Sequence, residues 1–219
     1  MNRALATLAE ATRRAGLLLT SWEQNGPQYT AHPATGAGVA ALRIVIRDDE
    51  DVDTVSRVRI MHCIAGRVFC AQAAVPLSKR PSDSLEDALV RSLSVAWILA
   101  ERWNVTGETP DVAFGGAERG NPHGRMAGRE GQAVWWLPHG AARTTQLVDG
   151  RVVDRTHRAT PERKVVVAVR ATGTPVFTVR YCGDEVARHT SAPDALRAAL
   201  AIEGIDYEGA PVVRRERAA

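Results

Sequence analysis

The sequence has few cysteines and no long apolar run. Its three cysteines, Cys63, Cys70 and Cys182, are odd in number and form no CxxC pair. This argues against a zinc site or a disulfide framework and favours reduced, partly buried thiols. No stretch approaches the roughly 20 apolar residues that span a bilayer, and Glu10 and Arg13 interrupt the one region resembling a signal peptide. We therefore expect a cytoplasmic protein with no membrane partner.

The chain also lacks the short motifs that carry known chemistry. It contains neither a phosphate-binding loop nor a dinucleotide fingerprint, and its histidines have no metal-ligand spacing. The acidic run at residues 48–53 lacks the glycine and the distal glutamate of a calcium-binding EF-hand loop. His62 and Cys63 are neighbours in an expected strand, so they face opposite sides and cannot form a dyad. We expect no catalytic residues, no metal and no cofactor.

Lysine is scarce, so arginine supplies nearly all of the positive charge. Only Lys79 and Lys164 are lysines, so the formal net charge of +3 comes almost entirely from arginine. The planar fork of arginine suits bidentate binding of phosphate oxygens. An excess of arginine with abundant alanine, valine and glycine is also what a GC-rich genome encodes. The composition therefore indicates a high-GC bacterium or its phage without requiring a ligand.

Two segments repeat one order of elements, three strands followed by a capped helix. In the first, alternating residues 42–47 and 55–64 precede residues 67–75 and a helix over 84–103. The second places strands and a helix within residues 164–205. The pattern predicts an α+β fold with antiparallel sheets packed on one face by helices, as two similar strand-strand-strand-helix subdomains. We favour two instances of a common pattern over an ancient duplication.

Helix signals support this architecture. Apolar residues recur at helical spacing through residues 3–19. Ser84 and Asp87 form a capping-box pattern that opens the long helix. Residues 95–100 are apolar all round, so we expect that helix to be the central core element. Ser191 begins the last helix in the same way.

These elements divide the chain into four parts. We expect a helix, a three-stranded sheet and a long helix over residues 1–105, and a Gly/Arg-rich linker over 106–131. A second α+β subdomain follows over 132–208, and a mobile tail over 209–219. Within the second subdomain, Asp149 and Gly150 between β-prone flanks give the strongest hairpin signal of the chain.

The strongest candidate for function is an arginine-bearing sheet face. Alternation places the arginines of the first two strands on the side away from the helix, while the linker adds three more among its glycines. The alternative is a solvated face paired with the acidic run at residues 48–53. The candidate nucleic-acid or anion-binding residues are Arg43, Arg47, Arg57, Arg59, Arg67, Arg119, Arg125 and Arg129.

Three functional hypotheses follow. The first is a non-enzymatic binding protein that contacts nucleic acid through the arginine face. The alternative is a protein-interaction or assembly component, such as a phage structural or host-directed factor or a self-associating protein, in which Trp135 or Trp136 forms contacts. An enzyme whose site assembles from distant residues ranks third.

Overall fold

The computed structural model describes residues 3–34, 40–45, 57–64, 67–77, 84–107, 126–129, 131–137, 143–148, 151–156 and 163–208. The helices are α1 (Arg3–Arg14), α2 (Leu85–Thr106) and α3 (Ala192–Ile202). The strands are β1 (Glu23–Asn25), β2 (Gln28–Ala31), β3 (Ala40–Val45), β4 (Arg57–Ile64), β5 (Arg67–Pro76), β6 (Met126–Arg129), β7 (Gln132–Trp136), β8 (Arg143–Val148), β9 (Arg151–Thr156), β10 (Lys164–Arg170), β11 (Val176–Tyr181) and β12 (Asp184–His189).

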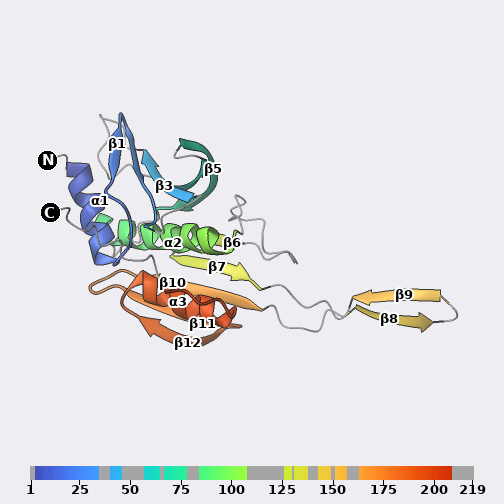
Figure 1. Cartoon of the computed structure of the whole chain (residues 1–219). Coiled ribbons are helices and arrows are strands. Elements are labelled where there is room, and N and C mark those ends of the chain that lie inside the picture. The colour runs from blue at the N-terminus through green and yellow to red at the C-terminus, as the bar shows by residue number, and fades with distance from the viewer. Residues whose placement is uncertain are drawn as a thin grey trace, which may run out of the picture.

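The strands form two five-stranded antiparallel sheets and a separate two-stranded ribbon (Figure 1). The first sheet has the order β1-β2-β3-β4-β5 and is followed in the chain by α2. The second has the order β6-β7-β10-β11-β12 and is followed by α3. The predicted α+β class is confirmed, and the repeated order is longer than expected because each sheet has five strands.

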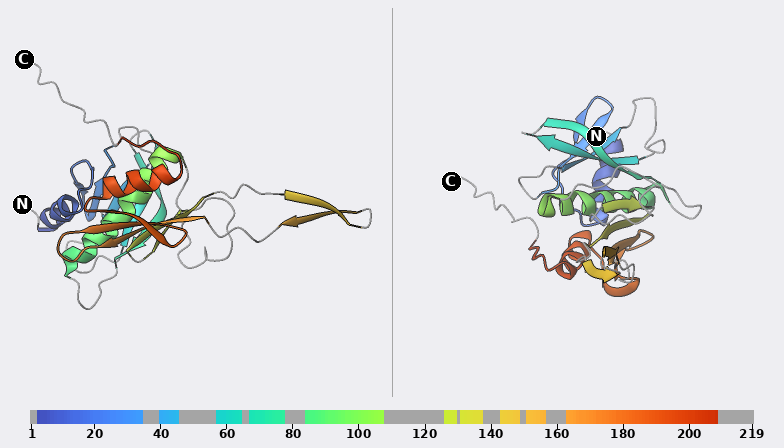
Figure 2. Two further views of the ribbon diagram at one scale, coloured as in Figure 1. Left: turned by 90° about the horizontal axis from the view of Figure 1, so that it is seen from below. Right: turned by 90° about the vertical axis from the view of Figure 1, so that its right-hand side faces the viewer.

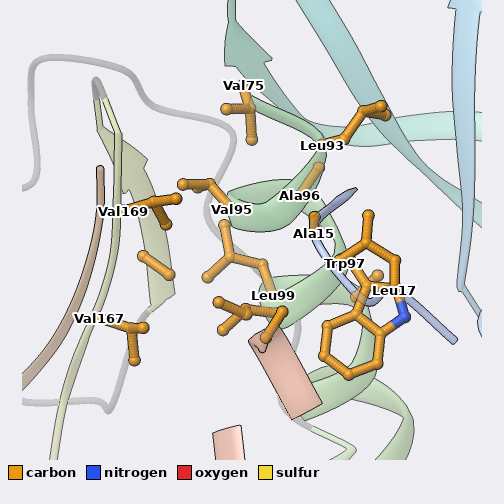
Figure 3. Close-up of a cluster of buried hydrophobic side chains, with 14 of the residues drawn as sticks. Ala15, Leu17, Val75, Leu93, Val95, Ala96, Trp97, Leu99, Val167 and Val169 are labelled. Carbon is orange, nitrogen blue, oxygen red and sulfur yellow. The ribbon is translucent and has the colours of Figure 1, made fainter. Parts of the chain in front are cut away.

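Helix α2 lies between the two sheets, as the right-hand view of Figure 2 shows. Ser84 caps its first turn with the predicted capping box, and Gly107 ends it in a left-handed conformation (φ 74°). Every residue from 87 to 103 is buried. In Figure 3, Leu93 lies near Val75 of the first sheet, whereas Leu99 lies on the side of Val167 of the second. The helix is therefore the central core element that the sequence predicted.

The N-terminal helix is shorter than predicted. It ends at Arg14 because Gly16 takes a positive φ of 63°, which turns the next residues away from the helix axis. Leu19 instead forms an isolated β-bridge with Pro33, and the Leu18 carbonyl accepts a 3.1 Å hydrogen bond from the Trp97 indole. The prediction of a helix over residues 3–19 is wrong for its last turn.

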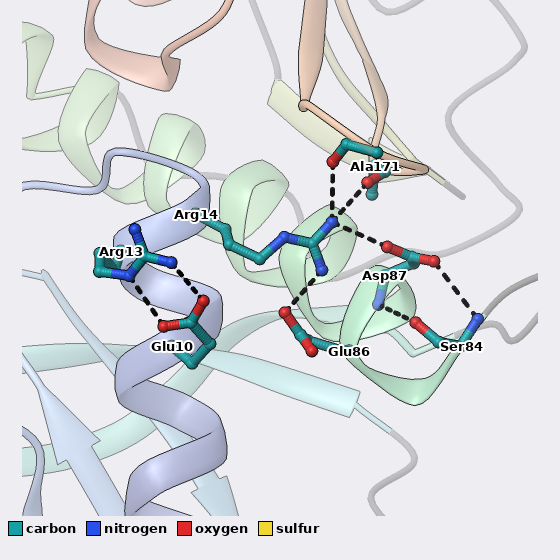
Figure 4. Close-up of polar contacts among 8 residues, drawn as sticks. Glu10, Arg13, Arg14, Ser84, Glu86, Asp87 and Ala171 are labelled. Atoms are coloured by element: carbon teal, nitrogen blue, oxygen red, sulfur yellow. Dashed lines mark hydrogen bonds and ion pairs between the residues drawn. The ribbon is translucent and has the colours of Figure 1, made fainter.

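Arg14 holds three parts of the fold together (Figure 4). Its guanidinium bonds Glu86 at 2.6 Å and Asp87 at 2.9 Å in the first turn of α2. It also donates to the carbonyls of Ala171 and Gly173, each at 2.9 Å, between β10 and β11. One side chain thus joins the end of α1 to the start of α2 and to the second sheet.

Two parts of the structure contain strands that the sequence did not predict. Asn25 pairs with Gln28 across a two-residue turn, so β1 and β2 form a hairpin. Residues 126–129, at the end of the expected linker, form β6 and pair with β7. Thr106 and Gly107, at the start of the expected linker, instead end α2. Residues 108–125 of the linker, and the expected tail from 209, lie outside the described residues. The domain division stays a prediction.

No helix among the described residues is long and apolar enough to cross a membrane.

Candidate nucleic-acid interface

Strands β3 and β4 position the best-described pair of candidate arginines. In β3, Leu42 and Ile44 are fully buried on either side of half-buried Arg43. In β4, Val58 and Ile60 are fully buried on either side of exposed Arg59. Alternate residues of a strand face opposite sides, and the buried set packs toward α2. Arg43 and Arg59 therefore lie on the outer face of the first sheet.

The two arginines are direct cross-strand partners. The β3–β4 register pairs Arg43 with Arg59, which places their Cβ atoms about 5 Å apart. Thr30 of β2 is the other neighbour of Arg43, and Ala74 of β5 is the other neighbour of Arg59. Like charges that face each other across a sheet are destabilising.

Neither guanidinium is neutralised within the described part of the chain. Arg43 and Arg59 form no ion pair there, and the Arg43 Nε is buried without a hydrogen-bond partner. The carboxylate in the same row of the sheet is Glu23, the cross-strand partner of Thr30. It lies two strands from Arg43, about 10 Å away at ordinary strand spacing. The acidic run at residues 48–53 lies outside the described residues.

The other candidates are spread over the molecule. Arg57 lies two residues before Arg59 in β4, opposite Pro76. Arg67 lies at the far end of the β4–β5 hairpin, opposite Ile64 and about 17 Å along the strand from Arg59. Arg129 belongs to the second sheet, opposite Gln132. Only the strand positions of these three are described. Arg47, Arg119 and Arg125 lie outside the described residues.

The outer face of the first sheet is not uniformly solvated. Ala41 and Met61, cross-strand partners two positions from the arginine pair, form a small buried cluster of their own. Val45, two positions away in the other direction, is exposed. The arginine pair therefore lies between a covered and an open part of this face. Met61 interrupts the arginine alternation in the sequence, and that is the signal which could have indicated the covered part.

Trp135, one of the two tryptophans considered for contacts with a partner, is fully buried and is not available for them. The guanidinium of Arg102 lies over its ring, 5.1 Å from the centroid. Adjacent strand residues face opposite sides of a sheet, and Trp135 faces the core. The side chain of Trp136 lies outside what the structure describes.

Two observations concern metal-binding and thiol groups among the described residues. No group of three histidine, cysteine or acidic side chains there could hold a metal ion. Cys182 is exposed, which makes the expectation of a partly buried thiol wrong at this position. It occupies a two-residue turn with Gly183, and both have positive φ (53° and 100°), as hairpin turns of this kind require.

Comparison with known proteins yields no relative, since no family model matches the chain and no curated protein or solved structure is similar to it. Function must therefore be argued from the geometry of the described residues. The feature with the clearest chemical consequence is the Arg43–Arg59 pair, a local concentration of positive charge on a sheet surface.

Proposed function

We propose that the protein is a non-enzymatic nucleic-acid-binding protein, with Arg43 and Arg59 contacting the phosphate backbone. The observation that carries the proposal is the register that sets these two arginines opposite each other, with no acidic partner among the described residues. Such a pair lowers the stability of the sheet. An anion bound between the two guanidinium groups reverses this effect.

A phosphate suits the chemistry of this position. Arginine binds phosphate oxygens through a planar fork of donors, and such charge-assisted bonds are about twice as strong as neutral ones. The hydroxyl of Thr30, next in the same row, is a group that commonly contacts phosphate. These groups read no bases, so we expect binding by the sheet face to be independent of sequence.

Titration with labelled single- and double-stranded DNA and RNA tests the proposal. We expect Arg43→Gln and Arg59→Gln each to weaken binding by a similar factor on every sequence, because phosphate contacts position the protein rather than specify bases. Arg188→Gln is the matched control, since Arg188 is an exposed arginine of the second sheet that pairs with Glu185. Wild-type protein that binds none of the four nucleic acids at low salt contradicts the proposal and favours the protein-interaction hypothesis.

A further inference from the structure

The β8–β9 ribbon is inserted between strands β7 and β10, which a short turn could join directly. Strands β7 and β10 are neighbours in the second sheet, with Trp136 opposite Lys164. One position further, the Leu137 amide donates a 2.7 Å hydrogen bond to the Arg163 carbonyl. Two residues would suffice to join antiparallel strands that are already paired at this point. The chain instead uses residues 138–162, which contain the ribbon.

The ribbon lies away from both five-stranded sheets. Figure 1 and the left-hand view of Figure 2 show it beyond the end of the second sheet, and it forms a sheet of its own. Val148 pairs with Arg151, which leaves the two-residue turn that the sequence predicted. Six paired residues on each strand give it a length of about 20 Å. An isolated two-stranded hairpin is marginally stable in water. A partner surface would stabilise it.

The register divides the ribbon into two chemically different faces. Antiparallel partners share a face, and faces alternate along each strand. The first face holds the pairs Thr144–Arg155, Gln146–Val153 and Val148–Arg151, with two arginines and no acidic residue. The second face holds Arg143–Thr156, Thr145–Asp154 and Leu147–Val152, where an aspartate accompanies the single arginine. Positive charge is therefore concentrated on the first face.

We infer that the β8–β9 ribbon binds double-stranded DNA by inserting into the major groove, with the Arg151–Arg155 face toward the bases. The inference rests on the proposed nucleic-acid-binding function and specifies its partner. The major groove of B-form DNA is about 12 Å wide and admits a two-stranded ribbon. Arginine and glutamine are the side chains that make bidentate contacts to guanine and adenine there. The first face carries both types, in Arg151, Gln146 and Arg155.

The width of the major groove predicts that the ribbon binds duplex DNA but not duplex RNA. The major groove of A-form RNA is deep and narrow, so side chains cannot read it. The ribbon therefore adds affinity for duplex DNA, and none for duplex RNA. The sheet face around Arg43 and Arg59 contacts phosphates of either nucleic acid. The two surfaces thus make different and separable contributions to binding.

The test compares two double variants in the full chain by fluorescence anisotropy with a 20-base-pair DNA duplex, an RNA duplex and single-stranded DNA. We expect Arg151→Ala with Arg155→Ala to weaken DNA-duplex binding about tenfold or more, because each bidentate base contact carries a large share of discrimination. The other two ligands should bind as they do to wild type. Arg143→Ala on the second face is the matched control, with a loss under about threefold.

A ribbonless variant supplies a second, independent measurement. The dipeptide Asn-Gly replaces residues 138–162, because Leu137 and Arg163 already form the pair that such a turn closes. We expect it to lose the preference for duplex DNA and to keep single-stranded binding. Unchanged duplex affinity in either variant overturns the inference and indicates a protein partner for the ribbon. In that event Arg43→Gln and Arg59→Gln still weaken binding, whereas failure of the proposed function appears as no binding by the wild type.

Discussion

Arg102 of α2 and Glu203 at the end of α3 form a buried, two-point ion pair. The Arg102 Nε lies 3.1 Å from Oε1 of Glu203, and Nη2 lies 2.7 Å from Oε2. The side chains are only 1% and 9% exposed. Because Arg102 also stacks on Trp135 of β7, this pair fixes both α3 and the second sheet to the central helix.

Breaking this pair should be strongly destabilising. Glu203→Ala removes the two-point ion pair from the buried Arg102 guanidinium, and we expect a loss of about 3–5 kcal/mol in the free energy of unfolding. Urea denaturation followed by tryptophan fluorescence measures it. Glu185→Ala, which breaks the exposed pair with Arg188, is the control and should leave the midpoint unchanged. Equal midpoints for the two variants would show that the buried pair contributes nothing.

Because α2 packs against both sheets, we expect the two sheets to unfold together. Leu93 and Leu99 are fully buried on different sides of α2. Leu93→Ala and Leu99→Ala should each cost about 2–5 kcal/mol and shift one shared, cooperative transition in calorimetry. Two separate transitions, each sensitive to one substitution, would instead mean that the two sheets unfold as independent domains.

Asp87 predicts an acid-dependent stability. Burial opposes its charge, but hydrogen bonds from Arg14 and Ser84 outweigh this and hold the pKa of Asp87 below its ordinary value of 3.8. A lowered pKa in the folded state stabilises the protein above the unfolded-state pKa, and the contribution is lost as pH falls through the folded-state value. Asp87→Asn should therefore be less stable than wild type at pH 7, with the gap narrowing below about pH 4. A gap that does not vary with pH would contradict this assignment.

Tyr207 predicts that the stability of the protein falls at alkaline pH. Two causes raise the pKa of Tyr207 above its ordinary value of 10.0. The larger is burial, and the second is a 2.7 Å hydrogen bond that the Tyr207 hydroxyl donates to Glu101. An unfolded chain ionises this tyrosine near pH 10 whereas the folded chain does not, so stability falls as pH rises further. Tyr207→Phe should lower stability by about 1.5–3 kcal/mol at pH 7 and reduce the alkaline slope. Denaturation at pH 7 and pH 11 measures both effects.

Local signals were sufficient for much of the fold. The alternation of Leu42 and Ile44 and the cap at Ser84 depend only on neighbouring residues, so the sequence predicted those elements correctly. Strand β1 reads Glu-Gln-Asn and has no apolar alternation, so nothing local marks it as a strand. Strand β6 lies among glycines, and pairing with β7 rather than its own composition defines it.

The sequence predicted the strand face of the candidate arginines but not their pairing across the sheet. Period-two alternation places Arg43 and Arg59 each on the side of its strand opposite the apolar residues. Their direct opposition depends on register, and a slip of one residue would move either arginine to the other face. Register is set by contacts between distant segments and cannot be derived from either strand alone. Asp149 and Gly150 likewise predicted a hairpin, but not its position away from both sheets.

The dependence of affinity on salt tests the central claim most directly. Each phosphate contact releases counterions, so the logarithm of the association constant falls with the logarithm of salt concentration by about 0.9 per contact on duplex DNA. We predict that substituting Arg43 and Arg59 together by glutamine flattens this slope by about two units, while Arg188→Gln leaves it unchanged. A wild-type slope near zero, or a slope that the double substitution does not alter, would contradict the account.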